Sequence, residues 1–163
     1  LWTRDMRFDA VARGAATVGV LFTFMMLTTG AIWGKPIWGT YWAWDARITS
    51  TLILFLLYTA YLLARSLADE VDEQAARYSA VYAIVAFLDI PIINMSVRWW
   101  RTLHPQPIVV QGALPVGMQV VLGLSMLAIG LLTVWLIVLR VETEGIGARA
   151  TALRAALDRR EGE

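Results

Sequence analysis

The residue types best suited to bind a ligand in this chain are aromatic, and they are concentrated in one stretch. Four of the eight tryptophans lie within twelve residues, at Trp33, Trp38, Trp42 and Trp44. Tyr41 and one acid, Asp45, lie among them. An indole ring is large and apolar with a single N–H donor, so a surface rich in it covers something flat and apolar or lies at a membrane interface. The composition therefore allows two interpretations, an aromatic ligand platform and an interfacial belt.

A second group of residues with binding chemistry lies further along the chain. The only histidine, His104, follows the paired tryptophans Trp99 and Trp100, with Arg98 and Arg101 beside them. A neutral imidazole nitrogen is a good iron ligand, although a lone histidine is more often structural. These residues add a ligand, two rings and two cations to the first stretch if the fold brings the two stretches together.

Both stretches match known motifs. Residues 38–45 read Trp-Gly-Thr-Tyr-Trp-Ala-Trp-Asp, which fits the pattern Trp-Gly-x-x-Trp-x-Trp-Asp. On this motif the chain resembles the tryptophan-rich (WWD) haem-handling proteins of cytochrome c maturation. The flanking residues 33–36 and 46–50 are most similar to the haem exporter protein C (CcmC) family, and residues 98–104 resemble the second haem loop of that family. The resemblance covers residues 30–140, and two motifs in the right order are very specific.

The resemblance implies a site that holds haem b transiently. Haem needs an axial ligand, an aromatic slot and cations for its propionates. His104 is the axial ligand that the resemblance implies, with Arg47 and Arg98 as propionate partners and Lys35 and Arg101 as weaker candidates. Six tryptophans are expected to contact the haem: Trp33, Trp38, Trp42, Trp44, Trp99 and Trp100.

Two further expectations concern the iron. Asp45 is expected to orient an indole N–H or a loop amide rather than contact iron, because a carboxylate would repel the anionic haem edge. In the family, two histidines hold the iron, one from each of two outer loops that flank the aromatic motif. The second ligand is therefore expected in a loop upstream of Leu1, with Met95 and Met118 as substitutes within the chain.

The resemblance also implies partners. The chain is expected to present haem to a periplasmic haem chaperone, the E-type member. An ABC-type ATPase, a second membrane subunit and a small single-span subunit would complete the same haem-release complex. This is a binding and transfer role in cytochrome c biogenesis, without classical turnover of its own.

The composition places these motifs in a lipid bilayer. Of the 163 residues, 58% are hydrophobic and 17% charged, and the apolar runs are longer than those of a soluble domain. A net charge of +1 makes no case for nucleic acid. Because cysteine is absent from the sequence, disulfides, thiolate metal sites and a Cys-x-x-Cys-His haem attachment are excluded.

Four apolar runs predict an all-α fold, an antiparallel bundle of four transmembrane helices that is part of a six-helix protein. Twenty helical residues cross a hydrocarbon core of ~30 Å. One transmembrane domain, residues 1–140, would contain spans at about 14–33, 48–64, 78–97 and 116–139. The tryptophan-rich outer loop would be residues 33–47, the second haem loop residues 98–115, and the cytoplasmic tail residues 141–163.

Helix breakers add local expectations. Pro36 and its neighbouring glycines predict that the first helix stops before them, and a short helix from Trp38 would then place Trp38, Trp42 and Asp45 on one face. Residues 1–13 are expected to be a loop or an interfacial segment.

The third span and the tail carry their own signals. Pro91 predicts a kink near residues 87–89, beside Asp89, which is either a neutral acid hydrogen-bonded to another helix or a proton site. Residues 148–160 are predicted to form a short helix in a solvated tail.

The distribution of lysine and arginine predicts the orientation. Ten of the fourteen lie in the amino-terminal segment, the loop after the second span and the carboxyl tail, and four lie in the two aromatic loops. The positive-inside rule then places both termini in the cytoplasm and both aromatic loops in the periplasm, across a bacterial inner membrane. The alternative function is a membrane-anchor or permease subunit whose tryptophans form only an interfacial belt. A quinone-linked b-type cytochrome ranks lower because its spans would need histidines.

Overall fold

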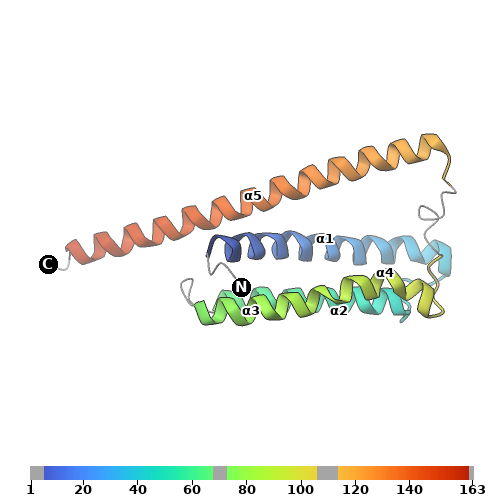
Figure 1. Ribbon diagram of the computed structural model, residues 1–163, viewed down its shortest axis with the longest axis horizontal. Helices are drawn as coiled ribbons and strands as arrows, with labels where there is room; N and C mark the ends of the chain where they lie inside the picture. The colour runs from blue at the N-terminus through green and yellow to red at the C-terminus, as the bar shows by residue number, and fades with distance from the viewer. Residues whose placement is uncertain (1–5, 68–72, 106–113, 162–163) are drawn as a thin grey trace.

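The computed structural model describes residues 6–67, 73–105 and 114–161, and the regular structure in these ranges is entirely α-helical (Figure 1). Its helices are α1 (Met6–Trp38), α2 (Ala46–Leu67), α3 (Glu73–Phe87), α4 (Asp89–Trp99) and α5 (Val116–Glu161). Because α3 and α4 follow one another along one path, the described chain has four segments long and apolar enough to cross a membrane. The predicted all-α, four-span fold is confirmed.

The centre of the bundle is α2, which packs against α1, α3 and α4. Successive spans run in opposite directions, and both ends of the described chain lie at the same end of the bundle (Figure 1). Within the described residues α5 packs only against α1. Figure 1 shows α5 close to α1 where α1 begins, diverging from it toward Val116, and extending past the bundle at its carboxyl-terminal end.

The pattern of side-chain burial is the one expected for a protein in a lipid bilayer. Large apolar residues face outward along the helices, for example Phe24 on α1 and Leu131 on α5. A soluble protein rarely exposes apolar patches of this extent, whereas lipid tails solvate them. Several small residues lie at the helix contacts, with Ser96 of α4 fully buried and Thr51 of α2 at 2% exposure, beside the larger Tyr61. Small side chains at these contacts let the helix backbones approach closely.

Helix α1 is longer at both ends than the sequence predicts. It includes residues 6–13, so the expectation of a loop there is wrong for the described residues, while residues 1–5 lie outside them. It also runs through Pro36 to Trp38. Because Pro36 has no N–H, one backbone hydrogen bond near the end of α1 is missing, but the helix continues past it. The helix stops instead at Gly39, whose φ of +79° is a left-handed conformation that glycine adopts without strain. The Gly39 N–H donates to the Lys35 carbonyl at 3.0 Å, which closes the helix end.

The third span is interrupted at the place where the sequence predicts a kink. α3 ends at Phe87 and α4 begins at Asp89, with Leu88 in a turn whose N–H donates to the Val85 carbonyl at 3.1 Å. Pro91 has no N–H for the Phe87 carbonyl, which accounts for the break. The buried Oδ2 of Asp89 has no hydrogen-bond partner among the described residues, so the neighbouring-helix bond expected for it is not formed there.

The carboxyl-terminal segment corrects another expectation. Residues 141–161 continue α5 without a break, so the helix predicted over residues 148–160 is part of a single 46-residue helix. The segment contains no proline and is rich in alanine, leucine, arginine and glutamate, which favour helix. Hydropathy predicts where a span leaves the membrane, but it does not predict where the helix stops.

Ion pairs hold the end of the bundle where α1 begins. We call this end of the bundle the inner end, the opposite end the outer end, and the residues Asp9, Arg13, Arg65, Arg140 and Glu144 the inner network; these names mark positions in the bundle only. The buried Arg65 donates from Nη2 to Asp9 Oδ2 at 2.7 Å, which joins α2 to α1. Glu144 of α5 pairs with Arg13 at 3.4 Å and with Arg140 at 3.2 Å. Next to this network a Cβ on Gly14 would lie 3.2 Å from Val141 Cγ2, so glycine permits the close approach of α5.

Candidate functional site

The connection between α1 and α2 is short and internally bonded. Only residues 39–45 lie outside helices, so the predicted loop over residues 33–47 and the predicted short helix from Trp38 are both wrong. The Thr40 hydroxyl donates to the Trp42 carbonyl at 2.9 Å and accepts from the Trp42 N–H at 3.3 Å. Lys35 Nζ donates to the Gly39 carbonyl at 3.0 Å and lies 5.2 Å from the centre of the Tyr41 ring. The Lys35 ammonium group, at the end of α1, is therefore already bound to residues of this connection.

Asp45 fixes the start of α2. Its Oδ1 accepts the Ile48 N–H at 2.8 Å, and its own carbonyl accepts the Thr49 N–H at 3.0 Å. This is the geometry of an N-cap, a position that aspartate favours because it satisfies a free helical N–H. The acid that ends the tryptophan motif is thus a structural part of the next helix.

The other oxygen of Asp45 joins the connection between α1 and α2 to the loop that follows α4. Oδ2 accepts the Leu103 N–H at 3.2 Å and lies 2.9 Å from His104 Nδ1. The loop residues 102–104 are themselves fixed by Thr102, whose hydroxyl donates to the His104 carbonyl and accepts the His104 N–H, both at 3.1 Å. As expected, Asp45 binds a loop amide, and it also binds the imidazole, which the sequence does not predict.

The surroundings of Asp45 favour its ionised form. Burial raises the pKa of its carboxyl group, but the hydrogen bonds from Ile48 and His104, the electrostatic attraction of His104 and the hydrogen bond from Leu103 together outweigh burial and leave the pKa below its usual value. An ionised carboxylate only accepts hydrogen bonds, so His104 Nδ1 must be the donor. A neutral imidazole protonated at Nδ1 has a lone pair at Nε2, and this nitrogen has no hydrogen-bond partner among the described residues.

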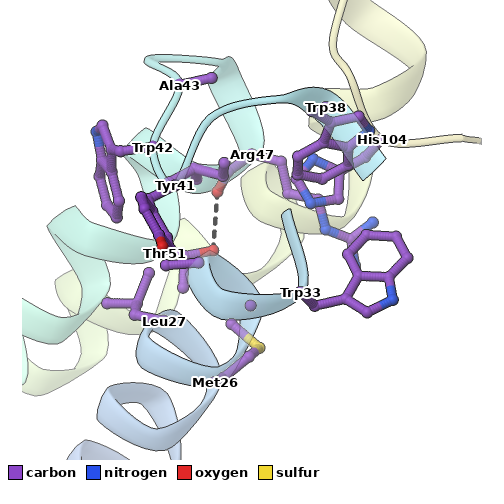
Figure 2. Close-up of a pocket in the computed structure, with 13 residues that line it drawn as sticks. Met26, Leu27, Trp33, Trp38, Tyr41, Trp42, Ala43, Arg47, Thr51 and His104 are labelled. Atoms are coloured by element: carbon purple, nitrogen blue, oxygen red, sulfur yellow. Dashed lines mark hydrogen bonds between the residues drawn. The ribbon is translucent and has the colours of Figure 1, made fainter. Parts of the chain in front are cut away.

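A pocket of about 230 Å³ opens beside His104 between α1, α2 and both loops (Figure 2). Figure 2 shows Trp33, Trp38 and His104 on one side of it and Tyr41 and Trp42 on the other. The lining residues are Met26, Leu27, Gly30, Ala31, Trp33, Trp38, Tyr41, Trp42, Ala43, Arg47, Ile48, Thr51 and His104. The lining therefore combines apolar and aromatic side chains with one imidazole and one guanidinium group.

The rings in and around the pocket pack edge to face. Trp38 lies 4.7 Å from His104 and 5.3 Å from Trp33, between ring centres. Trp42 lies 5.5 Å from Trp44, and Trp44 is 76% exposed. The buried Nε1 of Trp42 has no hydrogen-bond partner among the described residues. The Trp38 contact fixes one side of the His104 ring and Asp45 fixes its Nδ1 edge, so the ring is held from two directions.

Comparison with known proteins assigns the family. A family model described as "Heme exporter protein C" matches residues 1–156. The chain belongs to the haem exporter protein C family. The predicted membership of this family is confirmed.

Individual relatives agree with this assignment. A heme exporter protein C of Bradyrhizobium diazoefficiens is 50% identical over 96 residues, which cover 59% of this chain and 36% of the relative. The Haemophilus influenzae protein of that name is 40% identical over 132 residues, 79% of this chain and 53% of the relative. The Escherichia coli K12 protein is 37% identical over 142 residues, 87% of this chain and 57% of the relative. The chain spans about half the length of the curated relatives it matches.

The structure divides the ten predicted site residues of this family member into three groups. Five line the pocket: Trp33, Trp38, Trp42, Arg47 and His104. Two do not line the pocket but contact a residue that does: Asp45 is hydrogen-bonded to His104, and the Trp44 ring packs against Trp42. Three do not line it, namely Arg98, Trp99 and Trp100. Arg98 and Trp99 belong to the last turn of α4, so the second loop begins later than predicted, and residues 106–113 of that loop lie outside the described residues.

The sequence prediction missed the floor of the pocket. Met26, Leu27, Gly30 and Ala31 contribute to it from α1, one and two turns before Trp33. Their spacing from Trp33 could have predicted this, because residues 26, 30 and 33 share one face of a helix. Neither predicted substitute ligand, Met95 or Met118, lines the pocket. In the described residues, no three His, Cys, Asp or Glu side chains cluster as a metal site. Of the residue types that can bind haem iron, His104, Met26 and Tyr41 line the pocket.

Proposed function

We propose that this chain handles haem in cytochrome c maturation, binding it at the outer face of a bacterial inner membrane. The observation that carries the proposal is the arrangement of His104, whose Nδ1 is bound to Asp45 while Nε2 has no partner among the described residues, in a pocket rich in aromatic side chains. Imidazole nitrogen is a common axial ligand of haem iron. The printed name of the relatives, heme exporter protein C, is consistent with this substrate.

Each part of the pocket has a proposed role. His104 would bind the haem iron, and Trp33, Trp38 and Trp42 would cover the porphyrin through ring contacts. Arg47 would pair with a propionate, since a guanidinium group binds carboxylates in a planar, two-pronged geometry. Lys35, in the last turn of α1, is already bonded to the Gly39 carbonyl, which makes it the weaker partner.

The size of the pocket supports transient holding. Its volume of about 230 Å³ is below the ~300–1,000 Å³ of pockets that enclose most of a drug-sized ligand. We infer that these residues hold only part of the macrocycle and leave an edge accessible. Trp44, largely exposed beside Trp42, lies where a recipient would meet that edge. The proposed recipient is a periplasmic haem chaperone, and the proposed complex adds an ABC-type ATPase, a second membrane subunit and a small single-span subunit.

The proposed orientation places the pocket in the periplasm and both ends of the described chain in the cytoplasm. It is supported by the ten lysine and arginine residues assigned to the opposite end and the four assigned to the aromatic loops. The inner network, rich in arginine, lies at the proposed cytoplasmic end. The exposed pair Trp99 and Trp100 lies outside the pocket lining and would act as an interfacial belt, so the alternative interpretation of the tryptophans is retained for these two residues.

The test is haem retention after purification from membranes of cells that make haem. His104→Ala is expected to abolish or strongly shift the Soret absorbance per protein, because it removes the iron ligand. The matched control is Trp100→Ala in the same loop, which removes a large exposed ring outside the pocket and is expected to keep the parent spectrum. A His104→Ala protein with the parent's Soret band would refute the ligand assignment, and a parent without haem would favour a membrane-anchor role.

A further inference from the structure

We infer that Asp45 is a positioning residue for His104: it keeps the imidazole proton on Nδ1 and thereby presents the lone pair of Nε2 to the pocket. The inference rests on the proposed haem site and deepens it. Asp45 does not line the pocket, so it would act on a ligand only through His104. It is therefore distinguished from the residues that contact a ligand directly.

The direction of the hydrogen bond follows from the other donors around Asp45. Oδ1 accepts the Ile48 N–H at 2.8 Å and Oδ2 accepts the Leu103 N–H at 3.2 Å. Both backbone groups can only donate, so both carboxylate oxygens are held as acceptors. The contact of 2.9 Å between Oδ2 and Nδ1 is then a bond donated by the imidazole.

The same contacts limit how far the ring can move. Asp45 is 9% exposed and is fixed to the first turn of α2, while Trp38 lies 4.7 Å from the His104 ring. The ring therefore cannot exchange its two nitrogens without breaking the bond to Oδ2. Carboxylate groups that hold a ligand histidine in this way fix its tautomer and raise its basicity, and their loss typically lowers metal affinity ~10- to 100-fold.

Asp45 has a second structural role, which the experiment must separate from the first. Asp45→Ser keeps a hydroxyl oxygen that can cap α2, but its shorter side chain does not reach His104. Asp45→Asn keeps both the length and the cap, but it turns an NH₂ group toward His104 and Leu103. An amide donor facing Nδ1 would move the imidazole proton to Nε2, which is the nitrogen proposed to bind iron.

The first measurement is made without haem. Nitrogen NMR of isotope-labelled histidine reports which ring nitrogen carries the proton, and the His104 signal is assigned by its disappearance in His104→Ala. The parent is expected to carry the proton on Nδ1, Asp45→Ser to populate both tautomers, and Asp45→Asn to carry it on Nε2. Unchanged imidazole signals in Asp45→Ser and Asp45→Asn would overturn the inference.

The second measurement is haem affinity by titration followed through the Soret band. Asp45→Ser is expected to weaken binding ~10- to 100-fold and Asp45→Asn to weaken it further. Both keep the cap of α2 but lose the acceptor for the Leu103 N–H, so a modest drop in thermal stability is expected in both, and the affinities are compared at a temperature where all three proteins are folded. If the tautomer changes while haem affinity stays within twofold of the parent, the positioning role is overturned and the proposed function stands. If the parent binds no haem but the tautomer responds to Asp45, the proposed function fails and the control of the imidazole by Asp45 is supported.

Discussion

At each end of the bundle a buried carboxylate joins two segments of the chain, but the two carboxylates have different partners. At the inner end, Asp9 of α1 accepts a hydrogen bond from Arg65 of α2, and the pair is largely buried. At the outer end, the buried Asp45 accepts hydrogen bonds from Leu103 and His104 of the second loop. In both places one carboxylate joins segments that are more than fifty residues apart in the sequence.

The difference lies in the partner. A guanidinium group has five donors and no lone pair, so Arg65 can pair with Asp9 but cannot bind a metal. An imidazole ring has a second nitrogen, and when Asp45 occupies Nδ1 the lone pair at Nε2 is available. The comparison teaches that a buried carboxylate is evidence of function only when its partner retains a group that faces a pocket. By this criterion the inner network is structural, and the pair of Asp45 and His104 is the one that supports the proposed binding site.

Breaking the inner pair should have the largest effect on stability. Arg65→Leu leaves Asp9 largely buried without its closest cationic partner, and loss of one member of a buried ion pair typically costs ~3–5 kcal/mol. We expect this loss in the free energy of unfolding, measured in detergent micelles by tryptophan fluorescence during denaturant titration. The His104 tautomer should remain that of the parent, because the outer end does not depend on this pair.

A double variant sharpens the same prediction. Asp9→Leu combined with Arg65→Leu removes both charges and should recover most of the stability lost in Arg65→Leu, since an apolar pair avoids the desolvation of two ions. Arg65 also has two buried nitrogens, Nε and Nη1, without hydrogen-bond partners among the described residues, which adds to the cost of keeping it buried. No recovery in the double variant would show that the pair is not the source of the effect.

The close approach of α5 should give the next largest effect. Gly14→Leu places a large side chain where a Cβ alone would lie 3.2 Å from Val141 and 3.4 Å from the Ile137 carbonyl. Such overpacking typically costs ~1–3 kcal/mol, and the same unfolding experiment should register it. Gly19→Leu is the matched control in the same helix, because a Cβ there meets nothing within 4 Å. Equal losses from both substitutions would indicate that the contact with α5 is not tight.

The sequence predicts the spans better than their ends. Hydropathy places the four spans because the bilayer dictates their length, and Pro91 predicts the break between α3 and α4. The ends are set by local effects that hydropathy does not contain. Pro36 is tolerated because it lies in the last turn of α1, and the stop is made by Gly39 in a left-handed conformation.

For the site, the sequence predicts the residue types but not their pairing. The sequence identifies the tryptophan motif and His104 as candidate binding residues, and five of the ten predicted residues line one pocket. The contact between Asp45 and His104 spans 59 residues and depends on how α2 and α4 pack, so no local pattern contains it. Trp99 and Trp100 do not line the pocket, which depends on how α4 packs in the bundle and likewise has no local pattern.

The smallest expected effect separates the tryptophans within the outer end. Trp38→Ala removes the ring that contacts both His104 and Trp33, and an aromatic pair is worth ~0.5–1.5 kcal/mol, so haem affinity should fall ~2- to 10-fold. Trp99→Ala removes an equally large ring that does not line the pocket, and haem affinity should change less than twofold. Soret titrations of the two variants give the ratio directly. A larger loss from Trp99→Ala than from Trp38→Ala would mean that haem is held by the α4 end of the second loop rather than by the pocket beside His104.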